Sequence, residues 1–170
     1  MGALTPTLLA RESLTYYLKQ GAFLAKPAEL PEPLPGRAGV FVSFKKNGEL
    51  RGCIGTFAPT QPTIAEEIIR NAVSAGTEDP RFWPIELDEL PDLEVSVDVL
   101  GAPEQIDSVN ELDPKKYGVI VRKGRRSGLL LPDLEGVDTI DEQLSIAMQK
   151  AGIRPEEEVD LYRFTVTRYK

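Results

Sequence analysis

An arginine, a cysteine and two glycines lie together in residues 50–57, which read Leu-Arg-Gly-Cys-Ile-Gly-Thr-Phe. Cys53 is the only cysteine of the chain, and Arg51 precedes it by two residues. Alternate side chains share a face in an extended strand, so both should point to the same side. Because a nearby guanidinium favours the reactive thiolate, this spacing predicts a lowered pKa for Cys53 and a nucleophilic or metal-binding role. The alternative is that Cys53 packs as a small buried hydrophobe.

Gly52 and Gly55 flank this cysteine within the same expected strand. Glycine weakens a strand, and it is typical of positions where a bulge forms or another group comes close to the backbone. The segment therefore predicts a place where a small molecule docks.

Composition limits the chemistry that the chain can perform. The 170 residues include 41% hydrophobic residues and suit one domain. A net charge of −7 argues against DNA or RNA as a partner. The chain has no histidine, which excludes Ser-His and Cys-His pairs and histidine-bound metals.

The sequence also predicts where the protein resides. It lacks both a long apolar run and an N-terminal basic region followed by a hydrophobic stretch, so we expect a cytoplasmic protein with no membrane partner. A single cysteine is consistent with a reducing compartment. Nothing indicates a particular cofactor, and the acidic residues are too numerous to single out a metal-binding set.

Helical periodicity predicts three helices, which begin near Pro6, Thr63 and Thr139 and end near Gly21, Gly76 and Gly152. Thr63 and Thr139 each stand three residues before a glutamate, which is the capping-box pattern. Four prolines in residues 26–37 predict an extended linker.

Strand patterns occur in residues 39–44, 49–57, 93–99, 117–122, 128–131 and 162–167. An Asn-Gly pair joins the first two strands as a hairpin, in which residues 50–57 belong to the second strand. Most of the expected strands follow one another as hairpins, and strands and helices do not alternate regularly. The sequence therefore predicts an α+β protein with a two-layer arrangement, in which about three helices cover a mixed, mainly antiparallel sheet.

Charged and aromatic residues gather in two expected loops. Residues 79–84 (Asp-Pro-Arg-Phe-Trp-Pro) form a loop of the kind that often carries binding residues, although Phe82 and Trp83 are expected to cover the core. Residues 123–127 form a basic hairpin loop, either a solvated turn or a place where Lys123 or Arg126 contacts an anion.

The expected strand of residues 93–99 alternates between apolar and polar residues. Its acidic residues Glu94 and Asp98 lie roughly 13 Å apart along the strand, too far to share one ion, and are expected to face solvent.

Residues 50–57 and four further segments, in the same order, resemble the AMMECR-one domain family. The further segments are 79–82 (Asp-Pro-Arg-Phe), 93–100 with Pro103-Glu104 after it, 128–132 (Gly-Leu-Leu-Leu-Pro) and 150–152 (Lys-Ala-Gly). Because these matches span nearly the whole chain, it is identified as one AMMECR-one-like domain over residues 1–170. The resemblance implies an α+β fold of two unequal parts around a cleft. It assigns no reaction.

The resemblance also implies partners and site residues. Bacterial and archaeal relatives look like the A component of a three-part set, with a Memo-like protein and a radical S-adenosylmethionine enzyme. The residues that it places near the cleft are Arg51, Cys53, Gly55, Thr56, Asp79, Arg81 and Arg126.

Three hypotheses for the function follow. In the first, the protein is a small enzyme or enzyme component, in which Arg51 and Arg81 hold an anionic small molecule and Cys53 reacts. In the second, the same cleft belongs to a non-catalytic metabolite-binding or delivery module. In the third, Phe82 and Trp83 form the apolar patch of an interaction scaffold. Simpler roles remain open, since Arg81 could pair only with Asp79, and Thr56 could only cap a turn.

Overall fold

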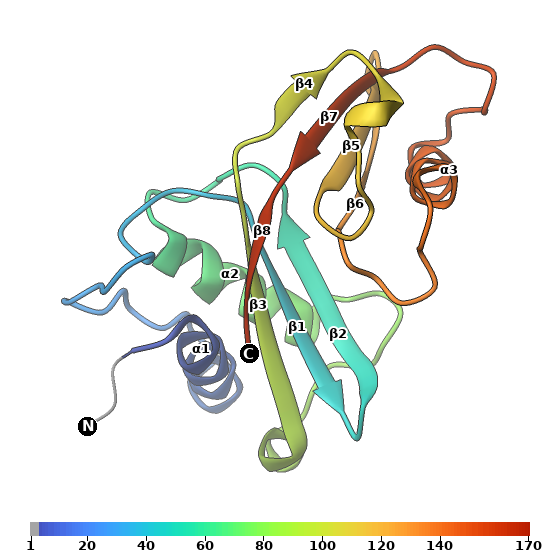
Figure 1. The fold of residues 1–170 in the computed structure, drawn as a ribbon. Coiled ribbons are helices and arrows are strands. Elements are labelled where there is room, and N and C mark those ends of the chain that lie inside the picture. Colours follow the sequence, from blue (N-terminus) through green and yellow to red (C-terminus); the bar gives the residue numbers. More distant parts are fainter. Residues whose placement is uncertain (1–3) are drawn as a thin grey trace. The chain divides into compact units, whose positions relative to one another are not determined.

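The computed structural model describes residues 4–170, which form two compact units, each with its own four-stranded sheet (Figure 1). The first unit extends to Val99 and also contains Thr167–Lys170, and the second unit is Leu100–Val166. The predicted α+β class is confirmed, but the strands divide between two antiparallel sheets instead of forming one.

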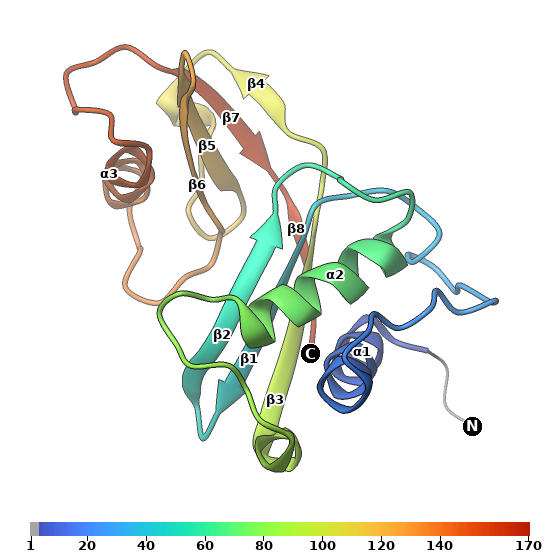
Figure 2. The same ribbon diagram turned by 180° about the vertical axis from the view of Figure 1, so that it is seen from behind.

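Two helices cover one face of the sheet in the first unit (Figure 2). They are α1 (Pro6–Gln20) and α2 (Ile64–Thr77). The strand order is β2-β1-β3-β8, and the strands are β1 (Val40–Lys46), β2 (Glu49–Thr56), β3 (Leu93–Leu100) and β8 (Val166–Tyr169). A short 3-10 helix, η1 (Leu87–Asp92), leads into β3.

Local capping explains where α1 and α2 begin. The Thr5 and Thr63 hydroxyls accept hydrogen bonds from the backbone N–H groups of Leu8 and Glu66, both at 3.2 Å. Between the helices and the sheet, a core of fully buried side chains includes Leu9, Leu14, Val42, Phe44 and Ile68.

The expected role of Gly76 as a helix-ending cap is wrong. Gly76 lies inside the last turn of α2, and Glu78 is the cap residue. A Cβ at Gly76 would lie 2.5 Å from Leu14 Cδ1 of α1. The glycine therefore allows the two helices to pack closely.

The second unit packs one helix, α3 (Ile140–Ala151), against a sheet of order β4-β7-β5-β6. Its strands are β4 (Glu104–Ile106), β5 (Gly118–Lys123), β6 (Arg126–Leu130) and β7 (Asp160–Phe164), with a 3-10 turn η2 (Val109–Glu111) between β4 and β5. Thr139 and Gly152 cap α3 as expected, with Gly152 at φ 70°.

The closing strand expected over residues 162–167 is in fact two strands, β7 and β8, which belong to different sheets. The break falls at Thr165, whose carbonyl accepts a hydrogen bond from the Gly101 N–H at 2.8 Å. The chain thus changes sheets at this point.

The basic loop of residues 123–127 is shorter than expected. Lys123 pairs with Arg126, so only Gly124 and Arg125 form the turn, with Gly124 at φ 61°. Within the described part of the chain, no helix combines the length and the apolar character needed to cross a membrane.

Candidate functional site

Residues 50–57 include most of β2, which lies at the edge of the first sheet. A Cβ at Gly52 would lie under 3.0 Å from the Ala75 carbonyl of α2, so α2 covers that face of the strand. Cys53, the next residue, lies on the opposite face of the strand. Its cross-strand partner on β1 is Ser43. A Cβ at Gly55 would overlap the Phe41 ring. The predicted close approach at both glycines is confirmed, but the protein's own atoms make it.

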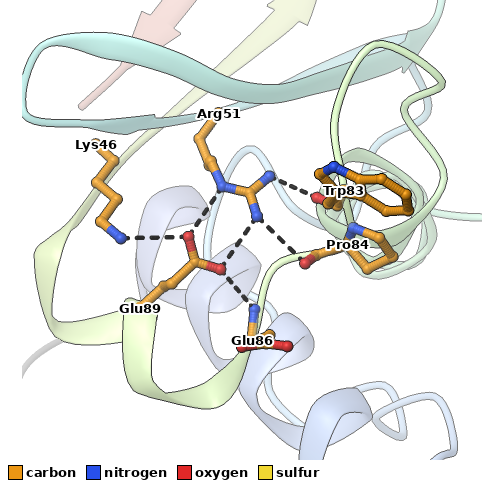
Figure 3. Close-up of polar contacts among 6 residues, drawn as sticks. All are labelled: Lys46, Arg51, Trp83, Pro84, Glu86 and Glu89. Atoms are coloured by element: carbon orange, nitrogen blue, oxygen red, sulfur yellow. Dashed lines mark hydrogen bonds and ion pairs between the residues drawn. The ribbon is translucent and has the colours of Figure 1, made fainter.

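The Arg51 side chain holds the loop that precedes η1 (Figure 3). Its Nε and Nη2 donate to the Glu89 carboxylate at 2.9 and 3.1 Å. Nη1 donates to the Trp83 carbonyl at 2.6 Å, and Nη2 also donates to the Pro84 carbonyl at 3.2 Å. The side chain is 18% exposed. An anion held by Arg51 would have to displace these acceptors.

Glu89 was not anticipated as a site residue, although it is the charged partner of Arg51. Its carboxylate also accepts from Lys46 Nζ at 3.3 Å and from the Glu86 backbone N–H at 2.8 Å (Figure 3). Hydrogen bonds from the Arg51 guanidinium hold the pKa of Glu89 at about 2, so it is ionised at neutral pH. No periodic pattern marks η1, so the sequence offered no signal for this contact.

The expected lowering of the Cys53 pKa is wrong. Burial raises the pKa of the thiol, and this effect outweighs the hydrogen bond from Ser43 Oγ at 3.1 Å and the attraction of Arg81. Asp98 and Asp79 raise the pKa further. Arg51 is not among the groups that shift this pKa, and its guanidinium donates to Glu89 instead.

Asp79 attaches the following loop to the edge of β2. Its side chain is 3% exposed and accepts from the Cys53 backbone N–H at 3.0 Å. Arg81 donates to the same carboxylate through its backbone N–H at 3.1 Å, Nε at 3.0 Å and Nη2 at 2.8 Å. The Arg81 guanidinium holds the pKa of Asp79 well below its usual range. The simpler alternative, an Asp79–Arg81 pair, is therefore present.

Thr56 takes part in a buried polar network. Its hydroxyl donates to Glu67 Oε2 at 2.9 Å and accepts from Asn71 Nδ2 at 3.1 Å. Glu67, only 1% exposed, also accepts from the backbone N–H groups of Thr60 and Gln61 at 2.7 and 3.0 Å. Glu67 could have been found from the sequence, because it stands between Ile64 and Ile68 on the apolar face of α2.

Arg126 belongs to the second unit, where its guanidinium is already hydrogen-bonded to other groups of the protein. Its Nη2 donates to Glu157 Oε1 at 2.9 Å, and its Nη1 donates to the Gly152 carbonyl at 2.9 Å. Its role at a cleft, like that of the other predicted site residues, stays a prediction.

Two exposure predictions are wrong. Trp83 is 87% exposed and does not cover the core. The backbone carbonyl of Trp83 accepts a hydrogen bond from Arg51 Nη1. Asp98 is 4% exposed instead of solvated, because Arg168 on the neighbouring strand β8 donates to it at 2.7 Å. Glu94 is exposed as expected.

Among residues 4–170, no three His, Cys, Asp or Glu side chains lie close enough together to hold one metal ion.

Alkylation should show the raised pKa of Cys53. We expect iodoacetamide to label the folded protein at pH 7.5 at least tenfold more slowly than the urea-unfolded protein, because only the thiolate reacts. The labelling rate should keep rising above pH 9. Mass spectrometry of quenched samples measures it, and folded-state labelling as fast as that of the unfolded chain would contradict the assignment.

The AMMECR1 family model matches residues 7–169, so the chain belongs to the AMMECR1 family and the expected membership is confirmed. A protein of Thermotoga maritima is 56% identical over 158 residues, which cover 91% of this chain and 90% of that protein. Protein CA_C1420 of Clostridium acetobutylicum is 56% identical over 164 residues, 95% of this chain, but the chain spans only 35% of that relative.

A solved structure shares the fold. The crystal structure of uncharacterized protein PH0010 from Pyrococcus horikoshii matches with a TM-score of 0.88 at 35% identity, covering 96% of this chain and 88% of that one. Membership of the family thus comes with a known fold, and it assigns no reaction.

Proposed function

We propose that this protein is a non-catalytic interaction module that docks a partner protein on Trp83. The observation that carries the proposal is an 87% exposed tryptophan on a loop whose backbone is held in place. A tryptophan side chain buries about 150–250 Å² when it is covered, and tryptophan is among the residues most enriched in binding hot spots. We call residues 79–85 the Trp83 loop.

The Trp83 loop is fastened at its start, middle and end. Asp79 accepts from the Cys53 N–H of β2 at 3.0 Å, and Arg51 donates to the Trp83 and Pro84 carbonyls. At the end, the Ile85 N–H donates to the Gly76 carbonyl at 2.8 Å, and the Ile85 side chain is 1% exposed. A loop held in this way loses little conformational entropy on binding, which favours affinity.

Two features weigh against the enzyme-component hypothesis. Burial raises the pKa of Cys53, so the thiol is neutral at pH 7 and is a poor nucleophile. The Arg51 guanidinium is engaged by Glu89 and two backbone carbonyls. In this proposal, residues 50–57 serve to build and hold the Trp83 loop.

The Clostridium acetobutylicum relative supports a module that works beside other protein domains. This chain spans about a third of that protein, so the domain is there part of a much longer polypeptide. The Memo-like protein and the radical S-adenosylmethionine enzyme, which only the family resemblance implies, are the partners to test first.

The test uses Trp83 as its own probe, because it is the only tryptophan of the chain. Protein labelled with 5-fluorotryptophan gives one ¹⁹F resonance, which we expect to shift when the purified Memo-like protein or radical enzyme is added. Trp83→Ala should raise the dissociation constant measured by calorimetry about 30-fold or more, which corresponds to the loss of about 2 kcal/mol or more that is typical of a hot-spot residue.

Phe23→Ala is the matched control, since Phe23 is an exposed aromatic of the same unit, at 42%. It should change affinity less than threefold. Binding that survives Trp83→Ala, or no binding by either protein, would contradict the proposal.

A further inference from the structure

A second feature of the first unit lies apart from the Trp83 loop. A cavity of about 580 Å³ opens between the first half of α1, the end of β1 and the start of β3. This volume lies in the range of about 300–1,000 Å³ that is usual for sites of small organic molecules. None of residues 50–57 or 79–85 lines it.

The cavity carries positive charge on a chain that is negative as a whole. Arg11, Lys45 and Lys170 line it, with Glu94 as the acidic residue of the lining. Its side chains therefore sum to about +2, against a net charge of −7 for the whole chain. Lys45 stands directly opposite Glu94 on the neighbouring strand. Among residues 4–170, however, no carboxylate lies within ion-pair distance of the Lys45 or Lys170 side chain.

Arg11 is held in place at the wall of this cavity. Its Nη1 donates to the Leu90 carbonyl at 2.8 Å, and its Nη2 donates to the Leu93 carbonyl. A guanidinium has five N–H donors, so these two bonds fix its position without exhausting it. Because the Arg11 side chain is already fixed, it loses little further conformational entropy when an anion binds.

The rest of the lining offers apolar surface. Leu8 is 39% exposed, Val95 is half-buried, and Leu93 contributes from the start of β3. Cations beside apolar side chains suit a ligand with a charged head and an apolar body.

We infer that this cavity binds a small organic phosphate, a phosphate monoester whose head lies among Arg11, Lys45 and Lys170. Its apolar body contacts Leu8 and Val95. The side-chain charge of about +2 matches the dianion of a monoester better than a singly charged carboxylate. This site is independent of the docking proposed at Trp83.

Calorimetry with phenyl phosphate tests the inference. We expect saturable one-to-one binding at 50 mM NaCl that weakens at least threefold at 300 mM NaCl, because exposed charges are screened. Inorganic phosphate should bind at least fivefold more weakly, since it lacks the apolar body. Lys45→Glu combined with Lys170→Glu should weaken phenyl phosphate binding at least tenfold.

Lys19→Glu combined with Lys26→Glu is the matched control. Both lysines are exposed, lie in the same unit and are absent from the cavity lining, so the net charge changes equally. This variant should bind within twofold of the wild type. An equal loss in both double variants, equal affinity for inorganic phosphate, or no binding of phenyl phosphate would overturn the inference.

Trp83→Ala separates this inference from the proposed function, because it should leave phenyl phosphate binding unchanged whether or not a partner docks at Trp83. Loss of phenyl phosphate binding in Trp83→Ala would contradict the placement of the phosphate site.

Discussion

Replacement of Gly52 by alanine is expected to destabilise the protein by about 3 kcal/mol. The new Cβ would lie under 3.0 Å from the Ala75 carbonyl oxygen and 3.1 Å from its carbon, both backbone atoms of α2. Overpacking typically costs about 1–3 kcal/mol, and the cost is at its upper end where backbone has to move. Urea unfolding followed by circular dichroism measures the loss of free energy of unfolding.

Gly36→Ala is the control for this substitution. A Cβ at Gly36 would meet the Pro33 carbonyl at 3.4 Å, which is ordinary contact, so we expect a change within about 0.5 kcal/mol. Gly128→Ala tests the same rule in the second unit, where the Cβ would overlap the Ala147 carbonyl of α3. If Gly52→Ala unfolds at the urea concentration of the wild type, the close packing of α2 against β2 at Gly52 is contradicted.

This expectation gives residues 50–57 a structural role that the sequence alone did not reveal. The glycines were expected to leave room for a ligand, since glycine is common where a group approaches the backbone. The approaching groups are the Ala75 carbonyl and the Phe41 ring. Sequence patterns show that space is needed beside a strand, but they do not show what fills it.

Features set by neighbouring residues could be predicted from the sequence. Thr63 and Thr139 cap their helices, and Asn47 and Gly48 take the positive φ angles, 54° and 80°, that their hairpin turn requires. Each helix cap and the hairpin turn depend on contacts between residues no more than about four positions apart. Such short-range contacts can be recognised from the residue types at neighbouring positions.

Features set by distant residues could not be predicted. The alternation of residues 162–167 continues without a break, although the chain changes sheets at Thr165, because each sheet needs the same alternating pattern. Arg51 and Cys53 were placed on one strand correctly, but Glu89, 38 residues from Arg51, decides where the guanidinium points. The pKa of Cys53 was expected to fall and instead rises, chiefly because the fold buries the thiol.

Glu89→Gln should lower the free energy of unfolding at pH 7 by about 2–3 kcal/mol. The substitution removes the charge that Arg51 and Lys46 contact and leaves a guanidinium that is only 18% exposed without its carboxylate. Because the folded-state pKa of Glu89 is about 2, against 4.5 in the absence of these contacts, its stabilisation is complete above about pH 5. It is lost as the pH falls through 4.5 towards 2, so the difference between variant and wild type should shrink to under about 1 kcal/mol near pH 2.

The control for Glu89 is Glu49→Gln, which removes the same charge from an exposed position at the start of β2. Surface carboxylates contribute little to stability, so we expect the free energy of unfolding of Glu49→Gln to differ from that of the wild type by no more than about 0.5 kcal/mol at pH 7. This difference should not shrink as the pH falls. Glu89→Gln should also loosen the Trp83 loop, because Glu89 orients the guanidinium that holds the Trp83 and Pro84 carbonyls. Hydrogen exchange at residues 79–85 should then speed up in Glu89→Gln and stay unchanged in Glu49→Gln. A pH-independent difference between Glu89→Gln and the wild type would mean that Glu89 acts through packing instead of charge.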